Sequence, residues 1–430
     1  MEQKNKKVVI IGAGMAGLSA AIKLLENGFS CAVLESESQP GGLARNFKIE
    51  NKYFSIGYHH ILKNDKPLLK MIDKVGLSGN IRWETQKAVF SVNGKIYNLI
   101  NPVDFIKFPL PIFDKLRFVA LMVHCFLKTN WTRNLGNARQ WLDEIAGENT
   151  RKTVFDSLTD IKYGLPSEYL SANWLGSRLH TQEFSKPLGY IPDKDWTKDL
   201  IDKMAERIKK LGGEIILNAQ VKKVLTGQNK FSGIVYSSNK QEKTILGDLL
   251  VSTVPPHVFL PLCDYRDSKM EKIEYLDAIS LILETDQKLP RDFYLLSCLQ
   301  PRYPFGGIFV LSKLNKTIGL KNGTVLNFFT NLNPQNDYLK NKTAKELLEI
   351  YQNDFEKLFG FRLKPNWSYF SFIKNYSPKF LNGYENPDIQ GNIENIYFAG
   401  NYMTYPLITS TGSAIASGEK TAELIIKNYV

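Results

Sequence analysis

A glycine-rich turn between an apolar strand and a helix is the strongest constraint that this sequence sets. Residues 7–11, KVVII, form a short apolar run rich in β-branched residues, which predicts a buried parallel strand. The turn GAGMAG follows at once, then an apolar helical pattern that ends near Gly28. A second apolar strand, SCAVLE, closes the unit at Glu35. This order of elements predicts an α/β fold built on a parallel sheet.

The residues of the turn have the properties that a dinucleotide site requires. Gly12 permits the tight turn, Gly14 leaves room for a pyrophosphate, and Gly17 lets the helix pack closely on the strand. The helix N-terminus, with Ala16 in its first turn, offers free N–H groups to phosphates. Glu35 would accept hydrogen bonds from ribose hydroxyls and would repel a 2′-phosphate. A glycine motif between strand and helix, with an acid about 20 residues on, predicts a Rossmann-type unit.

Residues 8–47 resemble the start of the flavin-containing amine oxidase superfamily. That superfamily includes monoamine oxidases, protoporphyrinogen oxidases, phytoene desaturases and, more distantly, UDP-galactopyranose mutases. The resemblance implies that the cofactor is FAD. It also implies that Gly41, Gly42 and Arg45, which follow the second strand, lie along the FAD. A surface position is the alternative for Arg45.

The middle of the chain also resembles this superfamily. Residues 196–211 are an amphipathic helical pattern, followed by a glycine pair and by the expected strand at 214–225. In the superfamily a valine of this strand touches the adenine, and Val221 is the matching position. Residues 248–256, DLLVSTVPP, resemble the buried strand and turn near the dinucleotide, and their pattern also fits an ordinary parallel core strand.

The last 36 residues carry the second strong part of the resemblance. A strand ends at Gly400, and Thr411, Gly412 and Ser413 open an amphipathic helix. The resemblance implies that this helix points its N-terminus at the flavin, where its dipole would stabilise the negative charge of the reduced ring. Asn401 stands where relatives commonly carry an acid, and its amide would bind a ribityl hydroxyl or a phosphate-linked water. The stretch has no cysteine, so a thioether-linked flavin is not expected.

Three residues are candidates for a place beside the flavin or the substrate. Residues 303–314, YPFGGIFVLSKL, are expected to form an aromatic, alternating strand in the floor of the substrate site. Many relatives hold a lysine near flavin N5, and Lys313 in this segment is the candidate here, with a surface lysine as the alternative. His59 lies in FSIGYHHI, where one of two adjacent histidines faces the flavin or both are structural; on a strand the pair would point to opposite faces and would make a poor metal site. Tyr405 would line the substrate face, although an amine cage needs two facing rings.

Length and resemblance together predict the domain plan. The 430 residues suggest about two to three domains. We predict a discontinuous FAD-binding domain of the GR2-like type, formed by residues 1–75, 196–260 and 385–430, with an inserted α+β substrate domain at 76–195 and 261–384 that includes a helical lid. Residues 101–128 are apolar, aromatic and edged with basic residues. They fit a buried helix of the substrate domain or a helix in the membrane interface.

We therefore expect an FAD-dependent oxidoreductase, acting as an oxidase, dehydrogenase or desaturase. It would transfer hydride from a hydrophobic substrate, such as an isoprenoid, carotenoid precursor or porphyrinogen, to flavin N5. The alternatives are a non-redox mutase or isomerase of the UDP-galactopyranose mutase type, an amine oxidase, and a flavin- or nucleotide-binding partner protein without catalysis.

Charge and cysteine content limit the binding partners, metal sites and cell compartment that we expect. The net charge of +12 is spread along the chain, which favours a solvated surface, with attraction to an anionic membrane or substrate as the alternative. A nucleic-acid partner is not expected. Four scattered cysteines without CxxC spacing predict no metal site or redox dithiol and fit a reducing cytosol. No signal-peptide region and no uncharged run of about 18 apolar residues is present. We expect a cytoplasmic protein with peripheral membrane contact as an option.

Overall fold

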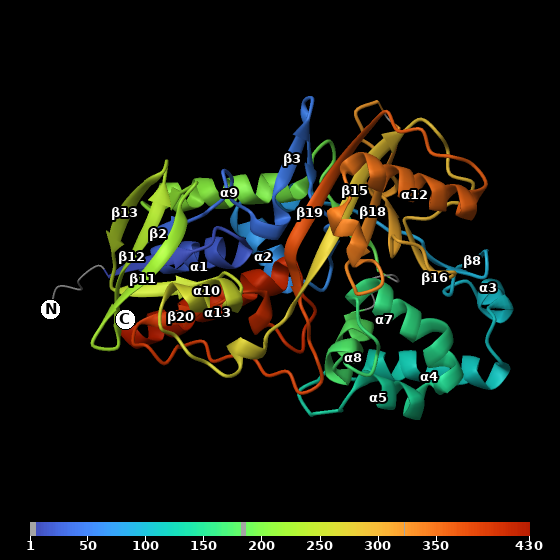
Figure 1. The fold of residues 1–430 in the computed structure, drawn as a ribbon, viewed down its shortest axis with the longest axis horizontal. Helices are drawn as coiled ribbons and strands as arrows, with labels where there is room; N and C mark the ends of the chain where they lie inside the picture. The colour runs from blue at the N-terminus through green and yellow to red at the C-terminus, as the bar shows by residue number, and fades with distance from the viewer. Residues whose placement is uncertain (1–5, 182–185, 322) are drawn as a thin grey trace.

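The predicted α/β fold is confirmed by a computed structural model, which describes residues 6–181, 186–321 and 323–430. Its first sheet has five parallel strands in the order β10-β2-β1-β14-β20 (Figure 1). The predicted strand–helix–strand unit opens it, and the last strand comes from the end of the chain. The strands are β1 (Lys7–Ile11), β2 (Ser30–Leu34), β10 (Glu214–Ile216), β14 (Leu249–Ser252) and β20 (Ile396–Phe398).

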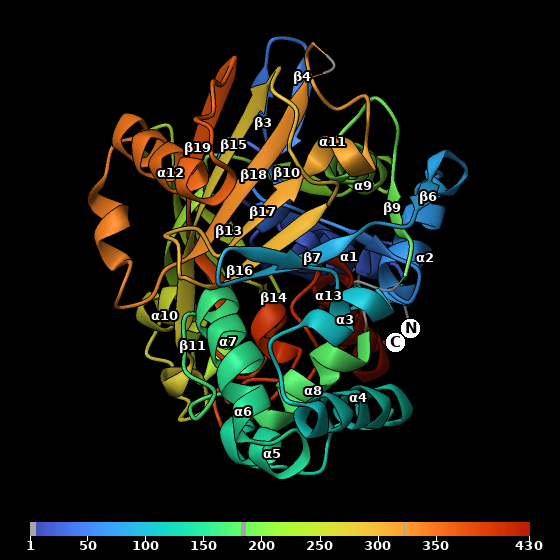
Figure 2. The same cartoon turned by 90° about the vertical axis from the view of Figure 1, so that its right-hand side faces the viewer.

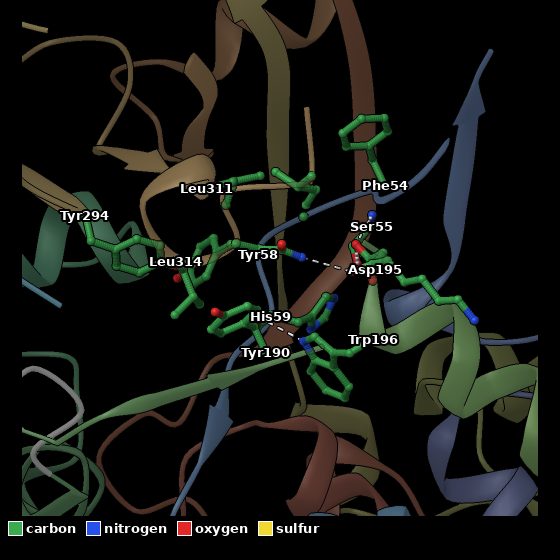
Figure 3. A pocket seen from close by; sticks show the side chains of 14 residues that line it. Phe54, Ser55, Tyr58, His59, Tyr190, Asp195, Trp196, Tyr294, Leu311 and Leu314 are labelled. Atoms are coloured by element: carbon green, nitrogen blue, oxygen red, sulfur yellow. Dashed lines mark hydrogen bonds between the residues drawn. The ribbon is translucent and has the colours of Figure 1, made fainter. Parts of the chain in front are cut away.

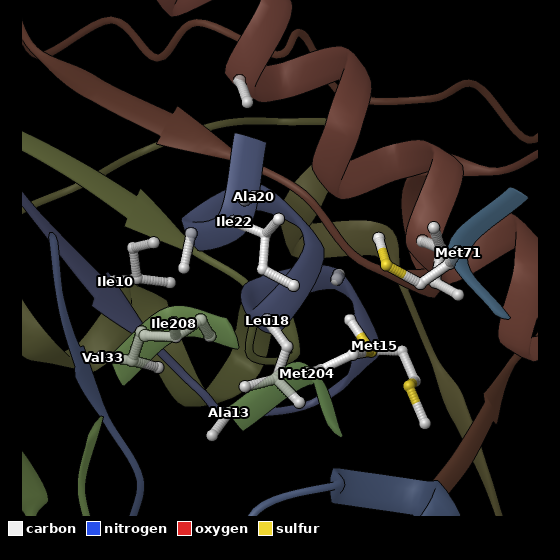
Figure 4. Packing of buried hydrophobic residues seen from close by; sticks show 14 of the residues in the cluster. Ile10, Ala13, Met15, Leu18, Ala20, Ile22, Val33, Met71, Met204 and Ile208 are labelled. Carbon is white, nitrogen blue, oxygen red and sulfur yellow. The ribbon is translucent and has the colours of Figure 1, made fainter. Parts of the chain in front are cut away.

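Each face of this parallel sheet buries its own hydrophobic cluster. Val8 and Ile10 of β1 face the helices, whereas Val9 and Ile11 face a three-stranded antiparallel sheet, as the alternation of a strand requires. Figure 4 shows side chains from β1, α1, α2 and α9 meeting in the helical cluster. The helices are α1 (Met15–Leu25), α2 (Lys66–Lys74), α9 (Trp196–Lys210) and α13 (Thr411–Tyr429); the antiparallel strands are β11 (Gln220–Gly227), β12 (Lys230–Ser238) and β13 (Gln241–Leu246).

A second large sheet has seven strands in the order β19-β15-β18-β17-β16-β7-β8. All of its pairs are antiparallel except β7 with β16. Its strands lie within the two segments predicted for the substrate domain; the domain boundaries stay a prediction. The strands are β7 (Ala88–Val92), β8 (Lys95–Tyr97), β15 (Tyr275–Thr285), β16 (Leu295–Gln300), β17 (Gly307–Val310), β18 (Thr324–Asn331) and β19 (Trp367–Pro378).

Short elements connect the two large sheets. Helix α12 packs Tyr351 and Phe355 into the core of the seven-stranded sheet. The hairpin β3–β4 packs Phe47 and Phe54 against the seven-stranded sheet and is bonded through Ser55 to the start of α9, and β5, β9 and β6 form a small sheet of their own. Their bounds are α10 (Pro256–Phe259), α11 (Leu311–Leu314), α12 (Ala344–Phe359), β3 (Asn46–Ile49), β4 (Lys52–Ser55), β5 (Ile61–Leu62), β6 (Arg82–Glu84) and β9 (Leu188–Tyr190).

A group of helices forms one end of the molecule, as Figures 1 and 2 show. They pack around Trp131, Trp141 and Trp174 in a hydrophobic cluster of their own. No helix among the described residues is long and apolar enough to cross a membrane. The helices are α3 (Pro102–Lys107), α4 (Ile112–Leu127), α5 (Ala138–Ile145), α6 (Glu148–Thr150), α7 (Asp156–Tyr163) and α8 (Ala172–Thr181).

Two of the predicted strands are interrupted in the structure. The strand expected at 214–225 is divided, because Asn218 adopts a left-handed conformation with φ of 52° and turns the chain. As a result β10 joins the parallel sheet and β11 joins the antiparallel one. The segment FVLSKL was expected to be strand throughout, but β17 ends at Val310 and residues 311–314 form the helix α11.

Candidate functional site

Two glycine loops meet at the N-terminus of α1. Gly12 has φ of 99°, and a Cβ atom on Gly17 would overlap the carbonyl oxygen of Gly12. Gly14 forms a backbone bridge with Gly41, and a Cβ atom on Gly42 would lie 3.1 Å from the Cα of Gly14. No side chain caps α1, and its first turn has no acidic residue. The arrangement is a backbone cradle whose free N–H groups suit an anion such as a diphosphate.

Glu35 stands beside this cradle at the end of β2. Its carboxylate accepts hydrogen bonds from the amides of Ala13, at 2.8 Å, and of Glu37, at 3.0 Å. The amide of Ala219 donates to the carbonyl of Glu35 at 2.7 Å. This bond brings the start of β11, with the half-buried Val221, to the same end of β2.

The predicted C-terminal helix begins where sequence placed it, at Thr411. A capping box closes its first turn: the Ser413 amide donates to Ser410 Oγ at 3.0 Å, and the Ser410 amide donates to Ser413 Oγ at 2.8 Å. Farther along, a Cβ atom on Gly418 would overlap the carbonyl oxygen of Ala16. The helix therefore packs against the helix that begins at the glycine cradle.

Asp65, which the sequence did not single out for the site, joins two helix N-termini. It caps α2 by accepting the Leu68 amide at 3.3 Å, and it accepts Ser410 Oγ at 3.3 Å. A Cβ atom on Gly412 would overlap its carboxylate. Burial raises the pKa of Asp65, while hydrogen bonds from Leu68, Ser410 and Gly412 oppose that rise. Its place before Lys-Pro predicts the α2 cap, but no local signal connects it to α13.

The remaining predicted cofactor residues lie at the edges of these loops. The Arg45 guanidinium donates to the Gly42 carbonyl at 3.0 Å and so braces the second glycine loop. Gly400 has φ of 136°, and its amide donates to Ser417 Oγ at 2.9 Å. Asn401 Oδ1 accepts the Tyr275 hydroxyl at 3.3 Å, which ties the C-terminal loop to β15.

A cavity of about 50 Å³ lies between the loop after β4, the start of α9, and α11 (Figure 3). Its walls are mainly aromatic and aliphatic, and Asp195 and His59 supply polar groups. The lining includes Tyr58, Tyr190, Trp196, Leu311, Leu314 and Ile318.

His59 lies in a loop after β4 and not on a strand. Its Nε2 is 3.3 Å from the Leu43 carbonyl oxygen, next to the second glycine loop, and its own carbonyl accepts the Trp196 indole N–H at 3.4 Å. Burial lowers the pKa of His59, against the opposing charge of Asp195, so the imidazole is neutral at pH 7. His60 contacts a different partner, the Tyr294 hydroxyl at 2.6 Å.

Asp195 is a second polar residue that sequence reasoning missed. Its carboxylate accepts the Ser55 amide at 2.7 Å and the Thr197 amide at 3.0 Å, and it caps α9. Both oxygens are thus engaged in holding β4 against α9. The local signal was Asp-Trp-Thr at the helix start, which predicts the cap and not the partner on β4.

The structure does not bring Lys313 or Tyr405 to the cavity lining. Because β17 ends at Val310, the turn of α11 presents Leu311 and Leu314 to the cavity, while Lys313 pairs with Asp292 at 2.8 Å on the surface. Lys313 and Lys87 lower the pKa of Asp292 to about 2. The Tyr405 hydroxyl lies 2.7 Å from Ser171 Oγ, and its ring packs on Phe380 and Tyr384.

A family model described as flavin containing amine oxidoreductase matches residues 15–426. The chain belongs to this family. It is an FAD-dependent oxidoreductase, as the resemblance at its two ends predicted.

Relatives and solved structures agree with this assignment. The chain is 22% identical to 15-cis-phytoene desaturase of an Oncidium hybrid cultivar, over 99% of the chain and 79% of the relative. It is 23% identical to mitochondrial protoporphyrinogen oxidase of Nicotiana tabacum, over 98% and 95%. A structure assigned as protoporphyrinogen oxidase, from Exiguobacterium sp. 255-15, superposes with a TM-score of 0.80 at 17% identity, over 99% and 100%.

Two further solved structures share the fold. They are reduced UDP-galactopyranose mutase, with a TM-score of 0.76 at 17% identity over 98% of this chain and 96% of the other, and putrescine oxidase, with a TM-score of 0.75 at 16% identity over 98% and 99%. At these identities the likeness concerns the fold alone.

The residues present fit FAD. The bare backbone cradle around Gly12, Gly14 and Gly42 has the donors that a diphosphate needs, and a side chain on Gly42 would press on the facing loop. The carboxylate of Glu35, beside this cradle, is of the type that would accept hydrogen bonds from ribose hydroxyls. Among the described residues no group of three His, Cys, Asp or Glu side chains is arranged to hold a metal ion.

Proposed function

We propose that this FAD-dependent oxidoreductase removes hydride from a C–H bond of an apolar small molecule. The observation that carries the proposal is the aromatic and aliphatic lining of the cavity, to which His59 contributes while it also contacts the Leu43 carbonyl of the second glycine loop. Such a wall binds an uncharged substrate through apolar contact and excludes water from the reacting atoms.

Within this proposal the cofactor is held by both ends of the chain. The N–H groups of the α1 N-terminus, with Gly41, Gly42 and Arg45, would bind the diphosphate, and Glu35 and Val221 would contact the adenosine side. Gly400, Asn401, Thr411, Gly412 and Ser413 would border the flavin. Bound FAD supplies the hydride acceptor. The N-terminus of α13 would stabilise the negative charge that accompanies reduction.

The proposed reaction is a desaturation, in which atoms and electrons balance. One substrate C–H bond breaks with loss of hydride, a neighbouring C–H bond loses a proton to solvent, and a double bond forms between the two carbons. The two electrons then leave the protein to oxygen or a quinone. His59 is neutral at pH 7, and the two charged residues of the lining are paired within the protein, Asp195 with Ser55 and Thr197 and Lys194 with Asp199, which suits an uncharged substrate.

The lining favours this substrate class over the two alternatives. Among the described residues that line the cavity there is no arginine, the side chain best suited to a sugar-nucleotide diphosphate, and Lys194 of the lining pairs with Asp199. Tyr58 is stacked on Phe309 with ring centroids 3.7 Å apart, and the Asp195 carboxylate is bonded to Ser55 and Thr197. One face of the Tyr58 ring is therefore covered, and the carboxylate is not free to pair with an ammonium group.

Anaerobic flavin reduction tests the proposal. The yellow protein is mixed without oxygen with phytoene, protoporphyrinogen, putrescine or UDP-galactopyranose, and flavin absorbance is followed. We expect bleaching by an apolar compound and none by putrescine. Bleaching by putrescine alone would contradict the proposal. Turnover of UDP-galactopyranose that needs reduced flavin and consumes no oxidant would establish the mutase alternative instead.

A further inference from the structure

Exposed apolar side chains gather on helices α3 and α4 and at Ile100, two residues before α3. Ten of the eighteen large hydrophobic residues that are exposed in the described parts of the chain lie within residues 100–127. Single exposed apolar residues are common on proteins, but a contiguous group marks an interaction surface. This α3–α4 face consists of Ile100, Val103, Ile106, Ile112, Phe113, Leu116, Val119, Val123, Phe126 and Leu127.

Helix α4 is apolar on both of its sides. Leu121 and Cys125 are buried against the protein, whereas Phe113, Leu116 and Leu127 point to solvent with 78%, 61% and 70% of their surface exposed. A surface helix of a globular protein normally has a polar outer side. The 16 residues of α4 rise about 24 Å, less than the about 30 Å of a bilayer core. The geometry suits a helix lying in an interface, and not one that spans it.

Within residues 95–133 the exposed charges have one sign. The exposed charged side chains are all basic: Lys95, Lys107, Arg117 and Arg133. Arg117 donates to the backbone carbonyls of residues 143–145, which leaves Lys95, Lys107 and Arg133 to contact a partner. The two acids of the segment are turned to the protein, because Asp104 accepts the Asn98 amide and the buried Asp114 accepts the Asn149 side chain. On neighbouring helices, Asp143 and Glu148 pair with Arg151, and Glu144 is exposed.

Apolar residues edged by basic ones complement an anionic lipid surface. The same pattern disfavours a second copy of the chain as the occupant, because the net charge of +12 and the shared basic edge would bring like charges together. Figure 1 places α3 and α4 at the end of the molecule opposite the two termini, so the face stands clear of the parallel sheet.

We infer that the α3–α4 face docks on the surface of an anionic lipid bilayer. The apolar side chains insert at the level of the headgroups, and the basic side chains contact the lipid phosphates. The inference deepens the proposed function and rests on it, since a bilayer is the phase in which an apolar substrate dissolves. The docking itself does not depend on the oxidation chemistry.

Vesicle flotation of the full FAD-loaded chain tests the inference. We expect the protein to float with phosphatidylglycerol-containing vesicles, to bind pure phosphatidylcholine vesicles weakly, and to dissociate as salt is raised. Leu116→Gln and Leu127→Gln should each weaken binding to the anionic vesicles several-fold. Leu246→Gln is the matched control, because Leu246 is 66% exposed on β13 and should leave binding unchanged.

Three outcomes would overturn the inference: no flotation with either vesicle, equal loss of binding in the Leu246 control, or a dimer in light scattering that Leu116→Gln dissociates. The proposed function is judged separately. If the protein floats as expected but its flavin is bleached by putrescine alone, the docking inference is supported and the proposal of an apolar substrate is contradicted.

Discussion

Gly42 and Gly76 have left-handed backbones, with φ of 56° and 78°, in different surroundings. A Cβ atom on Gly42 would lie 3.1 Å from Gly14, whereas nothing lies within 4 Å of one on Gly76. Both alanine variants therefore carry a similar backbone cost, but only Gly42→Ala presses on the diphosphate cradle. We expect Gly42→Ala to lower FAD affinity by about tenfold, or about 1.4 kcal/mol, and Gly76→Ala to leave it unchanged.

Titration of deflavinated protein with FAD, followed by quenching of flavin fluorescence, measures the two affinities. Equal affinities for the two variants would show that the approach of Gly42 to Gly14 has no part in cofactor binding.

Asp65 provides a residue-scale prediction with a defined pH dependence. Its pKa in the folded protein is raised above the ordinary value of 3.8. An acid with a raised pKa favours folding fully below its unfolded pKa, and that contribution is lost as pH rises through the folded pKa. Asparagine caps helices as well as aspartate does but does not ionise. We expect Asp65→Asn to raise the free energy of unfolding at pH 7, with the gain vanishing towards about pH 4.

Urea unfolding at a series of pH values checks this expectation. Asp73→Asn, at the exposed end of the same helix, controls for the loss of a carboxylate from α2. A lower stability of Asp65→Asn at pH 7 would mean that the charged form is needed to join α2 and α13.

At the scale of elements, α12 and α13 begin with the same capping box in different places. Thr343 and Glu346 close α12, and Ser410 and Ser413 close α13. Removing either cap, by Thr343→Ala or Ser410→Ala, should cost about 1 kcal/mol of stability, or roughly 1 °C in Tm for a chain of this length. Only Ser410→Ala should also weaken FAD binding, because α13 is the helix proposed to face the flavin.

Calorimetry of both variants, with and without added FAD, separates the two effects. The proposed role of α13 fails if FAD raises the Tm of the two variants by the same amount as it does for the parent chain.

Element-scale prediction succeeded where the sequence carries its own periodicity. The sequence predicted the strands β1 and β2 because each is a continuous apolar run. It predicted the helices α1, α9 and α13 because their apolar residues recur with a period of about 3.6 residues. The contacts of the site could not be predicted in this way. Asp65 and Ser410 are 345 positions apart, and Ser55 and Asp195 are 140 apart.

Lys313 shows the same limit on a shorter range. Residues 307–314 have the apolar content of a strand, yet β17 ends at Val310 and α11 follows. The lysine that was expected near the flavin lies on α11 and pairs with Asp292 on the surface. At helix caps and strand ends the local sequence pattern is least informative about where an element stops. The position of that end nevertheless decides where the neighbouring side chains lie.

At the scale of the whole molecule, the two ends of the chain are held together by the packing of α13 on α1. The contact is a backbone approach: a Cβ atom on Gly418 would overlap the carbonyl oxygen of Ala16, one turn from the glycine cradle. Both helices pack on the same face of the five-stranded sheet, because Val8 and Val251 of the sheet lie in the same hydrophobic cluster as Ala16 and Ile415 of the helices. With FAD held at the α1 N-terminus as proposed, cofactor binding and the closure of the fold would depend on one interface.

A pair of helical glycines tests this dependence. A Cβ atom on Gly176, in α8, would overlap the ring of the buried Trp131, so Gly176→Ala and Gly418→Ala both overpack a helix contact. Each should lose about 1–3 kcal/mol of stability in urea unfolding. We expect only Gly418→Ala to lower FAD affinity as well, since its displacement reaches the N–H groups of α1. Equal FAD affinity in the two variants would mean that the cradle keeps its shape when α13 moves, and that the ends of the chain act independently.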